Sequence, residues 1–218
     1  MSLWSDFLQN QGRPTNKWNL YFPAYERHLA RFRNLAVTMV EIGCGRGGSL
    51  QMWKRYLGPH ARIVGIDIEQ RAKDYEEDQI HVRIGDQSDT RFLQSVVDEF
   101  GAPDIVLDDG SHMASHMVAS FEFLYPKLSP TGLYMVEDLH ANYSHKFEGG
   151  YQQPGTFVEL CKTLVDGVVG FGLKKVPRNP ITDATLSMHI YDKLIIFERG
   201  RHEPAVSIRT GAIKKSAD

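Results

Sequence analysis

The sequence of 218 residues contains little cysteine, no long apolar run and no excess of positive charge. Its two cysteines, Cys44 and Cys161, can form at most one disulfide and have no metal-ligand spacing, so we expect reduced thiols. No stretch approaches the about 20 consecutive apolar residues of a membrane-spanning helix. The first residues have neither a basic segment nor a continuous apolar core, which argues against a secretory leader. These absences predict a soluble, cytoplasmic protein.

The charge balance also narrows the choice of partners. A formal net charge of -2 and a pI of about 6.5 leave no basic footprint for nucleic acid or an anionic membrane. With 42% hydrophobic and 24% charged residues, the chain has the composition of a globular protein with one substantial core. We therefore expect small-molecule partners, no nucleic acid and no membrane, and we leave homo-oligomerisation open.

Short segments rich in branched aliphatic residues alternate with helix-length segments, which is the pattern of an α/β protein. The alternation predicts a doubly wound, Rossmann-like, mostly parallel seven-stranded sheet. Near the end, 188–191 and 194–198 flank Asp192-Lys193 and predict an antiparallel hairpin. The other expected strands are 37–42, 62–66, 81–84, 105–107 and 133–136, and the expected helices are 49–56, 91–100 and one that ends at 121–125.

No repeat or linker indicates a second domain, so we expect one domain over 1–218. Within it, 1–36 form a helical segment that covers the cofactor or substrate, 37–200 form the catalytic core, and 201–218 form a tail. We expect the tail to be weakly ordered and frayed at Lys214 to Ser216.

A glycine-rich turn, VEIGCGRGGSLQMW, follows the first expected strand and leads into a helix. Such a turn lets a ligand approach backbone N–H groups at a helix N-terminus. Its spacing, G-x-G-x-G-G after Glu41, differs from the G-x-G-x-x-G of dinucleotide sites. Asp67, which ends the second strand, can accept hydrogen bonds from both ribose hydroxyls. Together they predict a nucleotide-like ligand, whereas the turn alone is equally typical of a tight strand-to-helix connection.

Polar residues also follow the third expected strand, in RIGDQSD. Asp86, Gln87 and Ser88 can read the amine and ring nitrogens of an adenine at the sheet edge. The alternative is that Ser88 or Asp89 caps the next helix. Both roles are compatible, because caps and ligand contacts use the same edge.

Two acidic pairs follow two further strands, Asp108-Asp109 in IVLDDGSH and Glu137-Asp138 in LYMVEDLH. If these strands are neighbours, four carboxylates meet at one edge of the sheet, and this charge needs a cation or a proton-transfer task to balance it. The alternative is two solvated strand exits that cap the following helices. Two exits with paired acids favour the metal site.

These motifs together resemble a known family. E-x-G-x-G-x-G at Glu41 to Gly47, with Asp67 and Asp86, is similar to the cofactor site of class I S-adenosylmethionine-dependent methyltransferases. Further segments resemble the sugar O-methyltransferases that modify macrolide antibiotics, of the mycinamicin and tylosin type, and the related cephalosporin hydroxylase-like family. They are TNKWNLYFPAYERHL, GGSLQMWKRYLG, GDQSD, DDGSHMASHM, EDLHANY and MHIYDKLIIFERG.

The resemblance implies two ligands and their residues. Magnesium or manganese, which prefer carboxylate oxygens, are expected on Asp109, Glu137 and Asp138, with His112 on the first helical turn as general base. Asp108 is left out of the ligand set because successive residues at a strand end point in opposite directions. S-adenosylmethionine is expected on Glu41, Gly43, Cys44, Gly45, Gly48, Ser49, Asp67, Ile68, Asp86, Gln87, Ser88 and Asp108, covered by Lys17, Tyr21 and Tyr25.

The function implied is methylation of a hydroxyl group on a sugar or another natural product. The polar, aromatic segment 140–155 is expected to form a wall or lid for this acceptor, and disorder without ligand is its alternative. His112 has an alternative role as a neighbour of a helix cap formed by Ser111. Three other functions stay open: a cephalosporin hydroxylase-like activity, a nucleotide-dependent oxidoreductase, and a cofactor-binding protein without catalysis.

Overall fold

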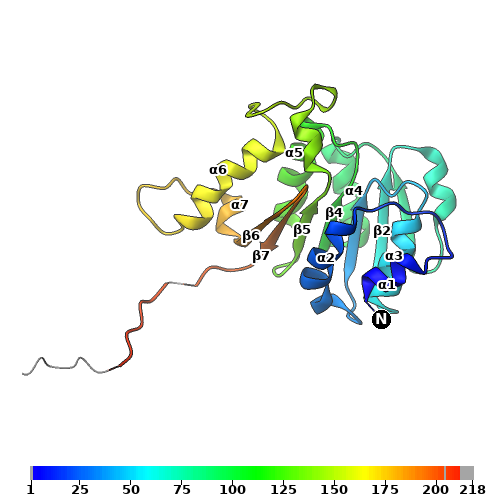
Figure 1. Ribbon diagram of the computed structural model, residues 1–218, viewed down its shortest axis with the longest axis horizontal. Helices are drawn as coiled ribbons and strands as arrows, with labels where there is room; N and C mark the ends of the chain where they lie inside the picture. The colour runs from blue at the N-terminus through cyan, green and yellow to red at the C-terminus, as the bar shows by residue number, and fades with distance from the viewer. Residues whose placement is uncertain (1, 204, 212–218) are drawn as a thin grey trace, which may run out of the picture.

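The computed structural model describes residues 2–203 and 205–211, so the expected fraying at Lys214 to Ser216 lies outside it. Its seven strands form one sheet in the order β3-β2-β1-β4-β5-β7-β6 (Figure 1). The first five are parallel, and β7 runs antiparallel to both β5 and β6. This confirms the predicted fold class. The strands are β1 Thr38–Ile42, β2 Arg62–Asp67, β3 Ile80–Ile84, β4 Ile105–Asp108, β5 Leu133–Val136, β6 Thr185–Tyr191 and β7 Leu194–Arg199.

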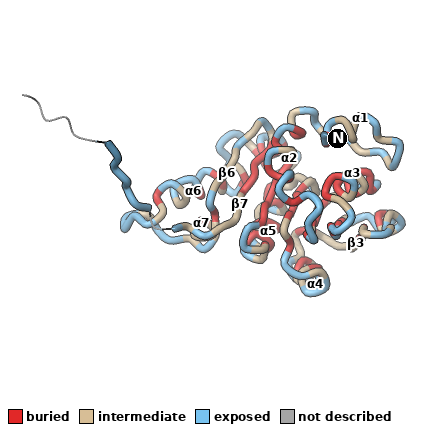
Figure 2. Tube along the Cα trace, turned by 90° about the horizontal axis from the view of Figure 1, so that it is seen from below, coloured by how far each residue is buried: buried red, intermediate tan, exposed pale blue. Residues whose placement is uncertain are grey.

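Helices cover both faces of this sheet, so its central strands are buried on both sides (Figure 2). Residues of α2 and α3 pack on one face, and residues of α4, α5 and α6 pack on the other. The helices are α1 Leu3–Leu8, α2 Phe22–Leu29, α3 Gly48–Leu57, α4 Thr90–Phe100, α5 Ala114–Leu124, α6 Phe157–Val169 and α7 Pro180–Asp183. Helix α6 lies in a part of the chain for which the sequence pattern led to no helix prediction.

The strand order reverses between β1 and β4, and this position locates the site. Both strands run in the same direction, with Ile42 level with Asp108, but their connections lead to opposite sides of the sheet. Ligands of open α/β sheets bind outside the carboxyl ends of the strands at such a switch point. The glycine turn and both acidic pairs lie at this edge, as the sequence predicts.

The N-terminal segment packs on the core through α2. Phe22, Tyr25 and Leu29 of this helix are buried, and the ring of Tyr25 meets Trp53 of α3 edge to face. The segment 1–36 thus contains a helix, as expected. It brings the residues just before it to the edge of the sheet that carries the acidic pairs.

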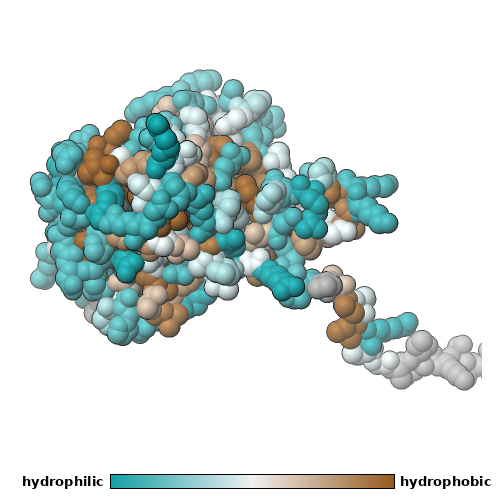
Figure 3. Space-filling view, turned by 180° about the vertical axis from the view of Figure 1, so that it is seen from behind, coloured by the Kyte–Doolittle hydropathy of each residue, from teal (hydrophilic) through white to brown (hydrophobic). Residues whose placement is uncertain are grey.

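The predicted hairpin between β6 and β7 is also present. Asp192 and Lys193 form its two-residue turn, and Lys193 has the left-handed φ of 64° that such tight turns need. The face seen in Figure 3 is mostly hydrophilic, with apolar side chains in separate patches. Among the described residues, no helix has the length and apolar character needed to cross a membrane.

Candidate active site

A cavity of about 290 Å³ lies at the carboxyl ends of the parallel strands, next to the glycine turn. Of the residues predicted to bind the cofactor, six line it: Gly43, Gly45, Asp67, Ile68, Asp86 and Gln87. Ile42, Ile66, Gly85, Asp109, Gly110, Ser111 and His116 complete the lining. The three turns that follow β1, β2 and β3 thus share one cavity.

The glycine turn has the backbone that only glycine adopts without strain. Gly43 has a φ of +84°, and a Cβ atom there would lie 2.1 Å from the carbonyl oxygen of Asp109. The turn that follows β1 therefore packs directly on the turn that follows β4. Asp67, at the end of β2, also fixes the glycine turn, because its Oδ2 accepts a hydrogen bond of 2.7 Å from the Gly45 N–H.

Several residues that were predicted to bind the cofactor do not line this cavity and contact other parts of the protein. Cys44 is buried, and its thiol packs against Gly65 in the core. Glu41 is fully buried and accepts a hydrogen bond of 2.8 Å from the Ser49 hydroxyl. A Cβ atom on Gly48 would meet the carbonyl oxygen of Pro14 at 2.3 Å, so this glycine permits contact with the N-terminal segment. The side chains of Glu41, Cys44 and Ser49 therefore point into the core and not into the cavity.

Asp108 and Ser88 also have protein partners. Asp108 is fully buried and accepts hydrogen bonds from Ser120 at 2.7 Å and Gln87 at 3.1 Å. Burial raises its pKa, and these hydrogen bonds partly oppose the shift. Ser88 donates its N–H and hydroxyl to Asp86, both at 2.8 Å. Asp89, one of the two predicted caps, accepts from the first N–H groups of α4.

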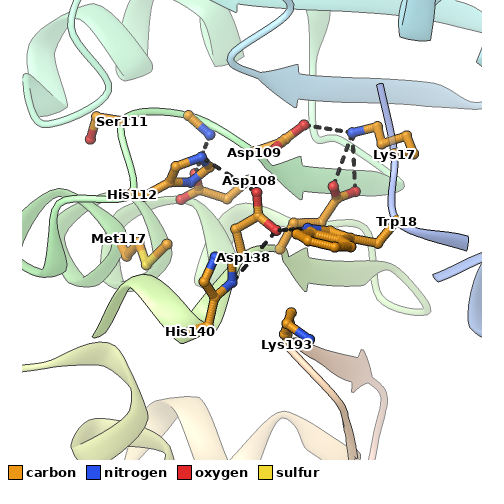
Figure 4. Close-up of polar contacts among 12 residues, drawn as sticks. Lys17, Trp18, Asp108, Asp109, Ser111, His112, Met117, Asp138, His140 and Lys193 are labelled. Atoms are coloured by element: carbon orange, nitrogen blue, oxygen red, sulfur yellow. Dashed lines mark hydrogen bonds and ion pairs between the residues drawn. The ribbon is translucent and has the colours of Figure 1, made fainter. Parts of the chain in front are cut away.

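Lys17 lies among the carboxylates at the centre of the acidic edge (Figure 4). Its Nζ lies 2.6 Å from Asp109 Oδ2, 3.0 Å from Glu137 Oε2 and 3.5 Å from Glu41 Oε1. Burial by itself would lower the pKa of Lys17, but the three carboxylates outweigh burial and raise this pKa. Lys17 was predicted to cover the cofactor, and the structure places it instead as the counter-ion of the acids.

Glu137 is oriented toward this lysine. It is 1% exposed, and in addition to Lys17 it accepts a hydrogen bond from the Tyr25 hydroxyl. Burial raises the pKa of Glu137, and Lys17 opposes the shift. Glu137 is thus a buried group and not the solvated strand exit of the alternative interpretation.

Asp138 lies beside His112 and is 21% exposed (Figure 4). Its Oδ1 accepts hydrogen bonds from Trp18 Nε1 at 2.9 Å and from the Tyr21 hydroxyl at 2.7 Å, and its Oδ2 lies 3.6 Å from His112 Nε2. Asp109, His112 and Asp138 each offer a ligand atom within 4.8 Å of the others. Tyr21, predicted at the cofactor, thus orients an acid of the candidate metal site.

The prediction that His112 lies on the first helical turn is wrong. The helix α5 begins at Ala114 with Met113 as its N-cap, and His112 precedes it with a left-handed φ of 59°. Ser111 is therefore not the cap either. This backbone turns the imidazole toward Asp138, and among the described residues its buried Nδ1 has no hydrogen-bond partner.

Two cavities meet at Asp109. A smaller one of about 120 Å³ is lined by Asn16, Lys17, Trp18, Asp109, Glu137 and Asp138. Asp109 lines the larger cavity as well. Trp18 and His116 were not predicted from the sequence, because a single tryptophan and a histidine inside a helix pattern are not typical of a binding site. The segment Asn16-Lys17-Trp18 lies opposite the acids only because the fold brings it there.

Comparison with known proteins agrees with this arrangement. The family model described as Methyltransferase domain matches residues 40–139. The 8-demethyl-8-alpha-L-rhamnosyl tetracenomycin-C 2'-O-methyltransferase of Streptomyces olivaceus is 40% identical over 198 residues, which are 85% of this chain and 52% of that enzyme. The mycinamicin VI 2''-O-methyltransferase of Micromonospora griseorubida is 36% identical over 199 residues, 84% of this chain and 49% of that enzyme.

A solved structure is similar as well. It is the MycE methyltransferase from the mycinamycin biosynthetic pathway in complex with Mg, SAH and mycinamycin VI. The match has a TM-score of 0.79 at 33% identity and covers 91% of this chain and 53% of that one. The chain spans about half the length of the curated relatives that it matches.

The fold, the glycine turn and these matches show that the chain belongs to the class I S-adenosylmethionine-dependent methyltransferases. Within this class it is similar to O-methyltransferases that act on glycosylated natural products. The family resemblance of the sequence motifs is thereby confirmed.

Proposed function

We propose that this protein transfers a methyl group from S-adenosylmethionine to a sugar hydroxyl of a glycosylated natural product, with a divalent cation such as Mg²⁺. The observation that carries the proposal is the position of Asp109, which lines both the cavity beside the glycine turn and the acidic cavity. A methyl donor in the first cavity would therefore adjoin an acceptor in the second. The sugar O-methyltransferases among its relatives support the choice of acceptor.

The residues of the larger cavity fit the cofactor. Asp67 provides a carboxylate for ribose hydroxyls, and Asp86 and Gln87 provide acceptors and donors at the adenine end. Hydrogen bonds from the Ser88 N–H and hydroxyl lower the pKa of Asp86, so this carboxylate stays ionised as an acceptor. At Gly45 no described heavy atom lies within 4 Å of the position that a Cβ would take, so a ligand can approach the backbone of the turn there.

The acidic cavity fits a hard cation. Three carboxylates, those of Glu41, Asp109 and Glu137, contact the ammonium group of Lys17, and the carboxylate of Asp138 lines the same acidic cavity. One ammonium group cannot balance all four carboxylates when they are ionised, and a divalent cation would supply the missing positive charge. Magnesium and manganese prefer such oxygen ligands. We propose Asp109, Glu137 and Asp138 as the residues that hold the ion, and Lys17 as the group that neutralises the charge that remains.

The chemistry divides between the bound groups and the protein. When bound, the cofactor supplies a sulfonium methyl group, and the divalent ion lowers the pKa of the acceptor hydroxyl. His112 accepts the proton of that hydroxyl, because its Nε2 lies 3.6 Å from Oδ2 of Asp138, one of the proposed metal ligands. Asp138 orients the ring and stabilises the imidazolium that forms. The carboxylates and aromatic groups around them hold the acceptor in line.

We propose that the acceptor lies against Trp18. Its side chain is 47% exposed beside Asp138, with Lys193 Nζ 5.2 Å from its ring and His140 meeting it edge to face. The same two residues, His140 and Lys193, line a further cavity of about 270 Å³ together with Tyr143 and others. His140 and Tyr143 belong to the polar, aromatic segment 140–155 for which a wall or lid over the acceptor was expected. A flat indole with a second cavity beside it suits a sugar attached to a larger aglycone.

Incubation of the purified protein with S-adenosylmethionine and a panel of rhamnosyl glycosides and their aglycones tests this function. We expect a methylated glycoside and equimolar S-adenosylhomocysteine by mass spectrometry with Mg²⁺ or Mn²⁺, and about 10²-fold less with a chelator. Undiminished turnover in the chelator would remove the metal from the proposal. Tighter binding of a nicotinamide dinucleotide than of S-adenosylhomocysteine would favour the oxidoreductase alternative instead.

Matched substitutions separate the two cavities. Asp67→Ala should weaken S-adenosylhomocysteine binding about tenfold or more, because it removes the expected ribose acceptor. Asp138→Asn should leave that binding within a factor of about three and raise the Mg²⁺ concentration needed for turnover. Asp166→Asn, on the exposed side of α6, serves as the control with wild-type behaviour in both assays.

A further inference from the structure

A second cluster of metal-ligating side chains lies at the opposite end of the sheet. His28 of α2, His189 of β6 and Glu198 of β7 each offer a ligand atom within 4.8 Å of the others. Glu198 lies level with Leu133, the first residue of β5, whereas the acidic pairs follow the last residues of β4 and β5. The cluster is therefore separate from the candidate active site.

Strand geometry explains why these residues meet. Ser187 pairs directly with Glu198 across β6 and β7, and His189 lies two residues further along β6, on the same face. Helix α2 packs on this face, and the imidazole rings of His28 and His189 lie 4.4 Å apart between centroids. Three elements that are distant in the sequence thus direct their side chains to one point.

The distances within the cluster match those between ligands of one metal ion. Zinc binds imidazole nitrogens and carboxylate oxygens at about 2.0–2.2 Å in a tetrahedral arrangement, so its ligand atoms lie about 3.4 Å apart. His28 Nδ1 lies 3.1 Å from Glu198 Oε1, and His189 Nε2 lies 3.7 Å from Glu198 Oε2. The two imidazoles thus face different oxygens of one carboxylate, and each nitrogen lies close to the tetrahedral separation from the oxygen that it faces.

The groups around the cluster orient its ligands. Without an ion, His28 Nδ1–H donates to Glu198 Oε1 at 3.1 Å. The Tyr191 hydroxyl lies 2.9 Å from His28 Nε2, so when an ion is bound it can accept the Nε2–H and leave the Nδ1 lone pair for the ion. The Ser187 hydroxyl donates to Glu198 Oε2 at 2.9 Å. Metal-binding histidines and carboxylates are held in this way by neighbours that contact their other polar atoms.

The protonation states also suit a metal ion. Burial lowers the pKa of His28, which favours the neutral imidazole. Burial by itself would raise the pKa of Glu198, but hydrogen bonds with His28 and Ser187 outweigh it, so this pKa is lowered and the carboxylate is ionised. A neutral imidazole and an ionised carboxylate are the forms that bind metals.

The cluster is open on one side. His28 is 3% exposed, whereas the side chains of His189 and Glu198 are 31% and 28% exposed. An ion could enter from the surface of the hairpin and keep a water molecule as its fourth ligand, as in sites with three protein ligands. Two nitrogen ligands favour a transition metal over magnesium.

We propose that His28, His189 and Glu198 bind a divalent transition-metal ion, with Zn²⁺ as the best match, and that the ion clamps α2 to the C-terminal hairpin. The clamp joins His28 to His189, which follows it by 161 positions in the sequence. Helix α2 also carries Tyr25, which contacts Glu137, so the ion would hold this wall of the candidate active site in place from outside. The proposal does not depend on the identity of the methyl acceptor.

The test is titration of the chelator-treated full chain with Zn²⁺ and with Co²⁺, whose visible absorption is intense in four-coordinate sites. Because Asp109, His112 and Asp138 could also take an added ion, every titration is repeated in Asp138→Asn. His189→Ala and the nearly isosteric Glu198→Gln remove one ligand each. His60→Ala, at an exposed position, is the matched control for loss of a histidine.

We expect the four-coordinate Co²⁺ spectrum and its displacement by Zn²⁺ in wild type, Asp138→Asn and His60→Ala. His189→Ala and Glu198→Gln should each weaken Zn²⁺ binding about tenfold or more, and the rise of Tm with Zn²⁺ should vanish in both. Circular dichroism without metal verifies that both variants fold. A spectrum that survives in both, or that disappears in Asp138→Asn alone, overturns the proposal.

Discussion

The ammonium nitrogen of Lys17 lies 2.6 Å from a carboxylate oxygen of Asp109, although 92 positions separate the two residues in the chain. The side chain of Lys17 is 2% exposed. This contact joins the N-terminal segment to the turn after β4, and it places one positive charge among the acids that we propose for the metal. The cluster is thus partly neutralised by the protein itself.

Replacement of Lys17 by Met should destabilise the protein. Removing one partner of a buried charge group leaves the carboxylates of Glu137 and Asp109 without their counter-ion, which typically costs about 3–5 kcal/mol. Urea unfolding measures the change, and saturating Mg²⁺ should restore part of it. Lys174→Met, at an exposed position, is the control. A loss below about 1 kcal/mol would show that the cluster does not need this ammonium group.

Replacement of His112 by Ala should lower kcat about 10²-fold or more, because the acceptor hydroxyl would lose the group that takes its proton. Binding of S-adenosylhomocysteine should change little, since the larger cavity is lined by other residues. Steady-state kinetics and calorimetry measure the two quantities. If kcat stayed within a factor of about three of wild type, His112 would be a neighbour of the helix start and not the base.

Two glycines with the same backbone angle allow a matched test of the glycine turn. Gly43 and Gly101 both have a φ of +84°, so an alanine at either position meets backbone strain, and the ψ of -173° at Gly101 lies in a region that only glycine readily adopts. At Gly43 a Cβ would also collide with the Asp109 carbonyl, whereas at Gly101 no described heavy atom lies within 4 Å. We expect Gly43→Ala to lose more stability in urea unfolding and at least tenfold in cofactor affinity. Equal losses in the two variants would contradict the role of the close contact.

Stability at low pH should depend on Glu76. Burial by itself would raise the pKa of Glu76, but hydrogen bonds from Lys73, the Val82 N–H and Arg83 together outweigh it and lower this pKa to about 2. Because this pKa lies below the unfolded value of about 4.3, the stabilisation is present above pH 4.3 and is lost as the pH falls toward 2. The side chain is 35% exposed, so we expect a contribution of about 1 kcal/mol or less.

Unfolding free energies of wild type and Glu76→Gln between pH 6 and pH 2 measure this contribution. The two curves should differ most above pH 4.3 and converge as the pH approaches 2. Parallel curves across the whole range would mean that the contacts of Glu76 contribute nothing that depends on its charge.

Much of the fold was predictable because buried parallel strands have a strong local pattern. The expected strand 133–136 matches β5, and the other parallel strands match within one residue at each end. Helix α6 was not predicted, although Thr156 caps it and Phe157, Cys161 and Leu164 lie buried at helical spacing. The polar, glycine-rich segment before it has the composition of a loop, and the helical pattern begins only where that segment ends.

The sequence by itself determined the class of fold, the glycine turn, Asp67 and the two acidic pairs, because each is a local pattern of neighbouring residues. Only the tertiary structure decided which acids share a cavity, that Lys17 lies among them, that Trp18 faces Asp138, and that His112 precedes its helix. These relationships join residues about 100 positions apart or depend on one backbone angle. No local spacing encodes them, since the packing of the N-terminal segment on the finished sheet brings them about.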